Sequence, residues 1–339
     1  MSIADLNDKK YISESKEGIS NDAVKESGIK LVPKNTVIMS FKLSIGKTAI
    51  TTIPLFTNEA IMAFIVKDKK LLISEYIYYY LKGYKWVGAN KAVLGMTLNK
   101  KSISGQIFSY PPLPEQEKIV AELDCLSGII EKKKQQLKEL DALAQSIFYE
   151  MFGDPVENEK GWEVRVLKDV STLLNGRAYK QNELLNEGKY KVLRVGNFFT
   201  NGNYYYSDLE LEDDKYCDDG DLLFAWSASF GAYIWDGGKV IYHYHIWKVL
   251  YDANLLNIQY YRYLLNTMTN FFMKDVHGIG MVHLTKAGME QYNLPLPPLS
   301  LQHSFASKVE AIEKQKELIK QSIAETELLF NSRMQYYFG

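Results

Sequence analysis

The sequence has only two cysteines among its 339 residues, Cys125 and Cys217, and neither belongs to a CxxC pair. This usage excludes a cysteine-rich zinc site and is typical of a protein from a reducing compartment. No apolar run reaches the length of about 18 residues that a membrane span needs. The opening residues, Met1 to Asp5, lack the basic start and apolar core of a signal peptide. Together these absences predict a cytoplasmic protein.

Motifs for catalysis and nucleotide binding are also missing. Gly46-Lys47-Thr48 ends like a phosphate-binding loop, but Phe41 stands where that loop needs its first glycine, which excludes ATP binding there. Nothing resembles a methyltransferase glycine loop with an Asn-Pro-Pro-Tyr-type motif, or the paired carboxylates of a nuclease. The sequence therefore predicts no catalytic residue and no cofactor held by the chain itself.

Two further groups of residues could in principle bind a metal, but the sequence predicts no metal site. His243 and His245 alternate along a predicted strand and would share a face. A zinc site needs a third ligand, so a packed histidine pair is the favoured interpretation. The acidic run Asp208–Asp221 lacks the spacing of an EF-hand and is interpreted as a solvated loop.

Composition and charge indicate a folded protein with an uneven surface. Apolar residues make up 46% and aromatic residues 13% of the chain, which is ample for the cores of two domains. The formal net charge is −1, yet residues 1–110 carry 16 Lys/Arg against 9 Asp/Glu, or +7. Residues 161–296 carry 13 against 16, or −3. A basic first part attracts polyanions, although such a surplus alone is more often an ordinary solvated surface.

An internal repeat organises the chain. Residues 111–153 and 297–339 align without a gap at an offset of 186, and both begin Pro-Pro-Leu, carry Gln at the sixth position and end in Phe-Gly. Proline fits the first turn of a helix and not its interior, so each copy predicts one long helix. Apolar residues recur four and three apart, as in a coiled coil. The predicted seam comprises Leu126, Ile130, Leu137, Leu140, Ile147, Ile312, Ile319, Ile323 and Phe330.

The two apolar stripes favour pairing of the long helices within the chain. Polar residues interrupt the stripes at four positions, which are Lys133, Lys316, Thr326 and Arg333. The alternative, that each helix only covers its own domain, fits the periodicity about equally well. The repeat favours pairing, because each globular segment is followed by the same helix.

The globular segments are duplicated as well. Residues 222–231 repeat the apolar strand and turn at 37–46, and residues 258–265 repeat the helix predicted at 73–82. Residues 162–185 have no counterpart in the first segment, so the first domain is expected to be truncated at its amino end. The predicted parts are a first domain at 1–110, a spacer helix at 111–153, a second domain at 154–296 and a spacer helix at 297–339.

This order of parts resembles the specificity (S) subunit of type I restriction-modification systems. The residues that carry the resemblance are PPLPEQEKIVAEL and IFYEMFGDP in the first long helix, and the second Pro-Pro-Leu helix. The resemblance implies an α/β (α+β) fold of two mixed α/β target recognition domains, joined by two long helices that form an antiparallel coiled coil. It also implies a non-catalytic subunit that recognises a bipartite site on double-stranded DNA.

The resemblance implies partners too. Two methyltransferase (M) subunits would dock on the long helices, and restriction/translocase (R) subunits would bind through M, with no membrane. S-adenosylmethionine, ATP and Mg are expected on those partners. The alternative is a truncated, DNA-silent fragment that acts as a scaffold for M subunits or as a recombination reservoir of recognition domains.

Polar and basic loops in both domains supply candidates for contact with phosphates and base edges. An ordinary polar turn is the favoured interpretation of any single loop, and their parallel placement in two domains selects them as a group. The second domain, which is complete, is the expected reader of DNA. The candidate DNA-binding residues are Arg177, Tyr179, Lys180, Arg194, Asn197, Ser227 and Ser229 in the second domain, and Lys42, Ser44 and Lys47 in the first.

Overall fold

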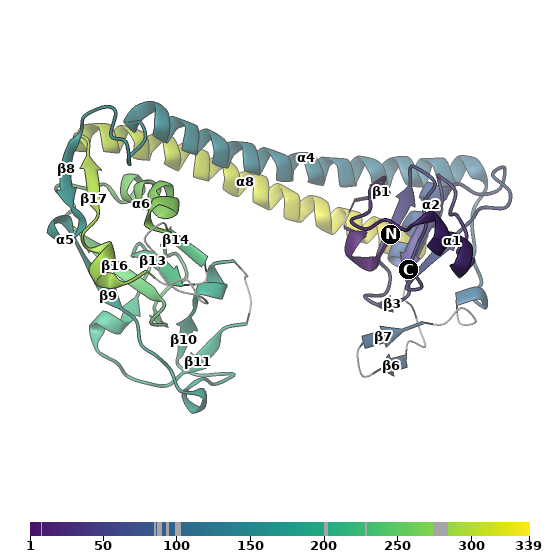
Figure 1. Ribbon diagram of the computed structural model, residues 1–339, viewed down its shortest axis with the longest axis horizontal. Helices are drawn as coiled ribbons and strands as arrows, with labels where there is room; N and C mark the ends of the chain where they lie inside the picture. Colours follow the sequence, from purple (N-terminus) through teal and green to yellow (C-terminus); the bar gives the residue numbers. More distant parts are fainter. Residues whose placement is uncertain are drawn as a thin grey trace. The chain divides into compact units, whose positions relative to one another are not determined.

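The chain forms two compact units, each with one globular lobe and a part of both long helices (Figure 1). Unit 1 comprises Met1–Gln136 with Ile319–Gly339, and unit 2 comprises Leu137–Leu318. The long helices are α4 (Leu113–Phe152) and α8 (Leu299–Phe338), of 40 residues each. The boundaries predicted at 111–153 and 297–339 thus lie at the ends of the long helices. The boundary between the compact units instead divides α4 after Gln136 and α8 after Leu318. The computed structural model describes residues 1–7, 9–84, 86, 90–92, 95–98, 103–199, 203–227, 229–273 and 284–339.

The long helices begin and end at the residues that the repeat shares. At the start of α4, the carbonyl oxygen of Pro112 accepts a hydrogen bond from the amide of Gln116 at 3.2 Å. The prolines occupy positions where a helix needs no amide donor. The helix ends at Gly153, whose φ of 75° lies in the left-handed region that favours glycine. The Gly153 amide caps the carbonyl of Tyr149 at 2.8 Å.

In unit 1, α4 and α8 run antiparallel, and the polar interruptions of the stripes are paired with polar groups across the seam. Lys133 Nζ lies 3.3 Å from the hydroxyl of Thr326, to which it donates. Toward the other end of this contact, Arg333 Nη2 donates to a carboxylate oxygen of Glu122 at 2.9 Å. These partners satisfy groups that would otherwise be costly to place in an apolar contact.

In unit 2 the same two helices also pair antiparallel. Lys316 forms an ion pair with Asp141 at 2.6 Å, and the rings of Phe148 and Phe305 lie 5.6 Å apart, both with 0% exposure. The predicted fold class, two mixed α/β domains joined by long antiparallel helices, is confirmed. The predicted seam residues are all buried or half-buried: Leu126, Ile130, Leu137, Leu140, Ile147, Ile312, Ile319, Ile323 and Phe330.

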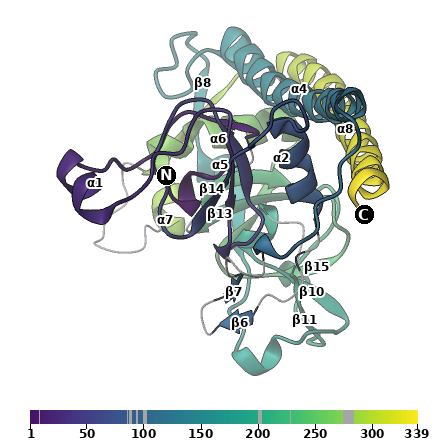
Figure 2. The same cartoon turned by 90° about the vertical axis from the view of Figure 1, so that its right-hand side faces the viewer.

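Lobe 1, residues 1–110, is built on a four-stranded sheet of order β1-β4-β2-β5. The central strand β2 is antiparallel to β4 and β5, and its residues Val37, Ile38 and Met39 are fully buried. Helix α2 packs between this sheet and the long helices (Figure 2). The elements are η1 (Ile3–Asp5), β1 (Tyr11–Ile12), α1 (Asn21–Ser27), β2 (Val37–Ser40), β3 (Lys42–Leu43), β4 (Thr48–Thr51), β5 (Ile61–Phe64), α2 (Ser74–Gly83), β6 (Asn90–Ala92) and β7 (Gly95–Thr97).

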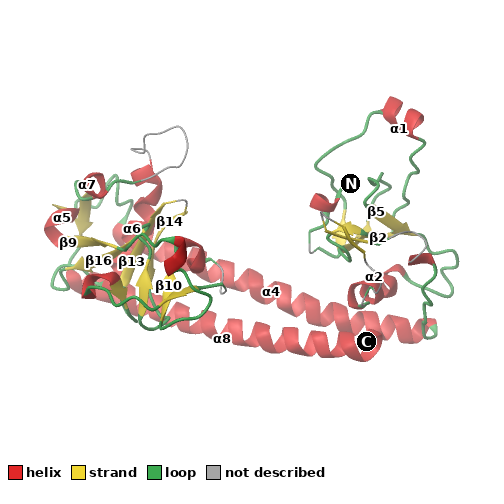
Figure 3. Ribbon diagram, turned by 90° about the horizontal axis from the view of Figure 1, so that it is seen from below, coloured by secondary structure: helices red, strands yellow, loops and turns green. Residues whose placement is uncertain are grey.

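Lobe 2, residues 154–296, repeats this plan and adds to it. Strands β14, β13, β16 and β9 lie side by side in one sheet (Figure 3). Strands β11, β10, β15 and β12 form another. A short pair joins β17 to β8. The elements are β8 (Glu163–Val166), α5 (Leu167–Val170), β9 (Ser171–Asn175), η2 (Gln181–Glu183), β10 (Tyr190–Leu193), η3 (Val195–Phe198), β11 (Tyr205–Ser207), η4 (Asp213–Lys215), β12 (Tyr216–Cys217), β13 (Leu222–Ser227), β14 (Ser229–Ile234), β15 (Val240–Tyr242), β16 (Ile246–Tyr251), α6 (Ile258–Phe272), α7 (Lys286–Met289) and β17 (Asn293–Leu296).

The glutamine at the sixth position of the first repeat ties lobe 1 to α4. Gln116 is 0% exposed. Its amide nitrogen donates to the carbonyls of Leu71 and Pro111, both at 2.8 Å, and its amide oxygen accepts from the backbone N–H of Ile73 at 3.2 Å. All three partners are backbone groups of the segments that lead into α2 and α4, so Gln116 pairs groups that lie outside the hydrogen bonds of those helices.

The second repeat uses the same arrangement. Gln302, also 0% exposed, donates to Leu255 at 2.9 Å and Pro297 at 2.8 Å, and accepts from the N–H of Asn257 at 2.8 Å. The shared contacts make Leu71 and Ile73 structurally equivalent to Leu255 and Asn257, an offset of 184. Lobe and long helix therefore form the repeating unit in three dimensions.

The acidic run Asp208–Asp221 is not a loop throughout, so that prediction is wrong for its second half. Within it, β12 pairs with β15, and Tyr216 and Cys217 are 8% and 1% exposed. Burial raises the pKa of the Cys217 thiol, which keeps it protonated. Asp221 forms an ion pair with Lys248 at 2.6 Å. The charges of the run are visible in the sequence, but the consecutive residues Tyr216 and Cys217 form a buried strand of the sheet.

Candidate nucleic-acid interface

Several of the candidate loops of lobe 2 meet at the turn between β15 and β16. The Arg177 amide donates to the carbonyl of Tyr242 at 3.0 Å, and the Tyr244 amide donates to the carbonyl of Arg177 at 3.1 Å. A Cβ on Gly176 would lie only 2.4 Å from the Tyr242 oxygen and 2.5 Å from the His243 oxygen. This close backbone approach requires glycine in the Asn-Gly-Arg motif.

The two histidines lie on this turn and not on a strand, which corrects the prediction. β15 ends at Tyr242 and β16 begins at Ile246. The rings of His243 and His245 are still adjacent, with centroids 4.8 Å apart. Burial, with smaller contributions from His245 and Arg194, lowers the pKa of His243 to about 4, so this ring brings no positive charge near pH 7. In the described ranges no group of three His, Cys, Asp or Glu side chains could hold a metal ion.

The hairpin of β13 and β14 joins the same turn. The Trp226 amide donates to the carbonyl of His245 at 3.1 Å, and its indole N–H donates to the carbonyl of Tyr244 at 2.9 Å. Ser227 and Ser229 face each other at the tip. Ser227 is only 1% exposed, so direct contact of its hydroxyl with DNA is not supported by its placement, whereas Ser229 is half-buried. Ala228, between them, lies outside the described residues.

Arg177 is held inside its own loop. Its guanidinium donates to both carboxylate oxygens of Glu183, at 3.0 and 2.8 Å, and lies 5.2 Å from the centre of the Tyr179 ring. Glu183 also accepts from the amide of Lys180 at 2.8 Å. The hydrogen bonds from Arg177 lower the pKa of Glu183 to about 2, so the pair stays ionised near neutrality. The arrangement fixes the loop 177–183, with 32% of the Arg177 side chain exposed.

Tyr179 and Asn197 also serve their own loops. The half-buried Tyr179 lies with its hydroxyl 3.4 Å from the carbonyl of Tyr242, and burial raises its pKa. The side-chain oxygen of Asn197 accepts from the amide of Arg194 at 2.9 Å and orders the start of η3. These two side chains hold the loops in position and add no charge to the surface.

Two of the cations predicted to bind DNA in lobe 2 face solvent, Lys180 and Arg194. Both side chains belong to exposed residues, and the Arg194 guanidinium lies 4.7 Å from the ring of Tyr205. Arg194 is brought to the turn because the amide of His243 donates to the carbonyl of Leu193 at 2.9 Å. Lys180 and Arg194 are more exposed than Arg177, and their charge is available to phosphates or base edges.

A cleft of about 420 Å³ opens beside the turn, and sequence reasoning missed most of it. Trp226 and Trp247 stack in its wall with ring centroids 5.4 Å apart and planes 19° apart. In a nucleic-acid interface, aromatic rings stack on unpaired bases or make apolar contacts with the methyl group of thymine. In the sequence, the signals for this region are the Asn-Gly-Arg loop, the turn at 226–229 and the run His243-Tyr244-His245, and none of them reveals a cleft. The lining residues are Asn175, Trp226, Tyr244, His245, Trp247, Leu284, Thr285 and Lys286.

In lobe 1 the three candidates lie on or beside the turn that joins β2 to β4. Lys42 is half-buried on β3, and Ser44 and Lys47 are exposed. The hydroxyl of Ser40 organises this turn by accepting from the amide of Lys47 at 3.1 Å. This turn corresponds to the tip of the Ser227–Ser229 hairpin in lobe 2. The candidate loops of the two lobes therefore lie at equivalent positions of the repeated fold.

Two α/β lobes of one plan, each on a long helix and with polar loops gathered at one end of its sheet, define a two-domain nucleic-acid-recognition protein. Residues 2–142 and 159–328 match the family described as "Type I restriction modification DNA specificity domain". The chain belongs to this family, and its function is that of a type I specificity subunit, which recognises DNA sequence.

Relatives and solved structures agree with this assignment. The MjaIX specificity subunit of Methanocaldococcus jannaschii is 27% identical over 341 residues, covering 89% of this chain and 76% of that protein. The type I restriction-modification S subunit from M. genitalium has the same fold, with a TM-score of 0.53, 12% identity, and coverage of 97% and 88%. A chain from a structural study of type I complex assembly and conformational transition gives a TM-score of 0.58 at 15% identity, covering 91% and 83%.

Among the helices that the structure describes, none combines the length and apolar character of a membrane-spanning helix.

Proposed function

We propose that the chain recognises its DNA target chiefly through the end of lobe 2 where the 176–180 loop, the Arg194 segment and the 243–245 turn meet. One observation carries this proposal: backbone bonds join the loops that hold two exposed cations, Lys180 and Arg194, to the 243–245 turn, whose Tyr244 and His245 line a cleft with aromatic rings. Lobe 2 has a formal charge of −3 over residues 161–296, so bulk attraction will not hold it on DNA. A few placed cations must do so.

The chain itself would be non-catalytic and would act in the cytoplasm, where its DNA substrate is found. The methyltransferase and restriction/translocase chemistry would belong to M and R subunits, with S-adenosylmethionine, ATP and Mg bound there. Two M subunits would dock on α4 and α8, whose outward faces carry polar residues together with exposed apolar ones such as Leu318 and Leu328. The proposal extends to a bipartite DNA site, because the lobe plan occurs twice.

Replacing Lys180 or Arg194 with Ala is expected to weaken DNA binding by the complex of this chain with its M subunit. A lost phosphate contact should lower affinity evenly across sequences and reduce the salt dependence by about one charge. A lost base contact should instead relax discrimination at one position by roughly 1–3 kcal/mol. Binding to cognate and one-base-changed duplexes at several salt concentrations separates the two results. Unaltered affinity, salt slope and discrimination in both variants would remove this face from the interface.

Arg177→Ala and Glu183→Ala serve as a matched pair in the same assay. If Arg177 acts by holding its loop, both variants should weaken binding, because each breaks the same ion pair. If Arg177 contacts DNA itself, removal of the Glu183 carboxylate should free the guanidinium and strengthen binding. If complexes that contain this chain bind DNA no more tightly than the M subunit alone, the chain would instead be a DNA-silent scaffold.

A further inference from the structure

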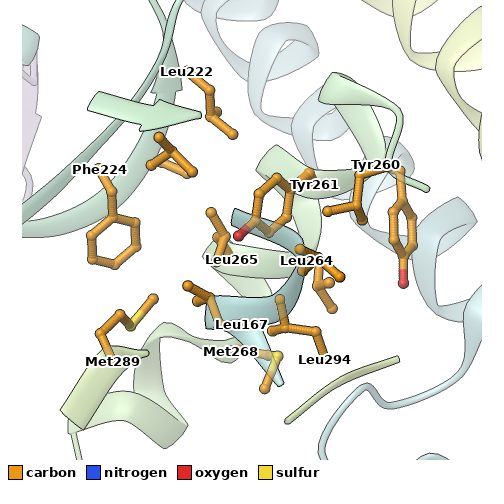
Figure 4. Close-up of a cluster of buried hydrophobic side chains, with 14 of the residues drawn as sticks. Leu167, Leu222, Phe224, Tyr260, Tyr261, Leu264, Leu265, Met268, Met289 and Leu294 are labelled. Atoms are coloured by element: carbon orange, nitrogen blue, oxygen red, sulfur yellow. The ribbon is translucent and has the colours of Figure 1, made fainter. Parts of the chain in front are cut away.

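In lobe 2, one strand–helix–strand segment fills a groove between the sheet and α6. The segment is β8, α5 and β9, residues 163–175, with β8 antiparallel to β17 and β9 antiparallel to β16. Its side chains Leu167, Val170 and Leu173 are 0%, 3% and 1% exposed. Figure 4 shows Leu167 among the side chains of α6 and β17. The segment therefore completes both the core and one edge of the sheet.

Lobe 1 has an equivalent groove, which is lined by residues at the corresponding positions of the repeat. The contacts of Gln116 and Gln302 show that a residue of α2 corresponds to the residue 184 positions later in α6. For the residues just before the prolines of the long helices, the repeat gives a difference of 186 positions. The residues that surround the segment in lobe 2 thus have apolar counterparts in lobe 1. The pairs are Leu72 and Leu256, Ile77 and Tyr261, Tyr80 and Leu264, Leu81 and Leu265, Ile103 and Met289, and Phe108 and Leu294.

In lobe 1 these residues line an open cleft of about 300 Å³. Strand β5 is the outer strand of its sheet, and no described strand pairs with its far side, where β9 pairs with β16 in lobe 2. Residues 107–110, the counterpart of β17, form no strand. The side chains at the rim are unusually open for apolar residues: Ile107 is 87% exposed and Ile65 is 59% exposed.

We propose that this cleft of lobe 1 is a docking surface for a strand–helix–strand segment of another polypeptide. Its first strand would pair with residues 107–110 and its second with the outer edge of β5, because an open edge offers unpaired N–H and C=O groups to an added strand. Between them, one helical turn would place two aliphatic side chains three residues apart in the cleft, as Leu167 and Val170 do in lobe 2. A third aliphatic side chain on the second strand would match Leu173.

A second copy of the chain cannot supply this segment from its own lobe 2, because Leu167, Val170 and Leu173 are already buried there. A small molecule would fill the cleft but leave the edge of β5 and residues 107–110 unpaired. A separate segment with alternating apolar residues satisfies both features together.

The test uses a labelled synthetic peptide with the sequence of residues 159–177, added to the full-length chain. Saturable binding is expected, with new hydrogen-exchange protection at residues 61–64 and 107–110. Ile107→Glu and Ile65→Glu in the chain should each weaken binding by about tenfold or more, since each places a charge at the rim, and their exposure in the free chain means that folding is retained. Leu31→Glu, at a residue 54% exposed elsewhere on lobe 1, should leave binding unchanged.

A peptide in which Leu167 and Leu173 are replaced by Ser should bind at least about tenfold more weakly than the native peptide. The proposal fails if the native peptide does not bind, if its binding is indifferent to Ile107→Glu and Ile65→Glu, or if protection arises only in lobe 2. It also fails if the chain alone dimerises and Ile107→Glu abolishes the dimer, because the occupant would then be a second copy.

Discussion

Ile323→Asp is expected to lower the free energy of unfolding by about 3 kcal/mol or more, since it buries an unpaired carboxylate in the contact between α4 and α8. Ile323 is 8% exposed in unit 1, where these helices pair. Leu137→Asp, at a half-buried position of unit 2, should cost less. Urea unfolding followed by circular dichroism measures both effects.

The matched control is Leu328→Asp on the outer face of α8. Leu328 is 73% exposed, so the same chemical change there should alter the unfolding free energy by less than about 0.5 kcal/mol. Hydrogen exchange should localise the Ile323→Asp effect to residues 113–136 and 319–339. Equal stability of the Ile323 and Leu328 variants would show that α8 does not pair with α4 through this stripe.

Gln302→Leu is the second substitution with a large expected effect, at about 3 kcal/mol. Three backbone groups lose their partner at once, the N–H of Asn257 and the carbonyls of Leu255 and Pro297, and a buried polar group left unpaired costs roughly 1–3 kcal/mol. Gln302→Glu keeps the acceptor for Asn257 but loses both donations, so it should also destabilise lobe 2. Thermal unfolding with hydrogen exchange at the start of α6 is the measurement.

The repeat provides the comparison for this prediction. Gln116→Leu should destabilise the start of α2 in lobe 1 by a similar amount, because Gln116 makes the same three contacts. Gln315→Leu, at an exposed position of α8, should leave both lobes unchanged. Tolerance of Leu at both Gln116 and Gln302, with stability like that of Gln315→Leu, would contradict the proposed role of the shared glutamine.

The long helices and the duplicated lobes were predictable because their signals are local. Proline before each helix, Phe-Gly at its end and an apolar repeat of four and three all act within a few turns of chain. The role of the shared glutamine was not predictable, since the partners of Gln116 at Leu71 and Ile73 lie 45 and 43 residues away. The polar interruptions were visible, but their partners on the opposite helix depend on the register of the pairing.

The candidate interface was predictable only as a set of loops. The Asn-Gly-Arg motif marked the right segment, but the bond from Arg177 to Glu183 forms only once η2 turns the chain back on itself. Burial of Ser227 depends on packing around the hairpin, which residue type does not reveal. The histidines were assigned to a strand because alternation of residue types is shared by strands and by some tight turns.

The central claim, that this chain selects the DNA sequence through lobe 2, is tested most directly by mapping methylated bases in cells that carry the M subunit. With this chain present, one sequence motif should be methylated, and it should be unmethylated when the chain is absent. A chain with both Lys180→Ala and Arg194→Ala should lose or relax that motif while still co-purifying with M. The account is contradicted if the same sites are methylated without the chain, or if the double variant gives an unchanged motif at unchanged efficiency.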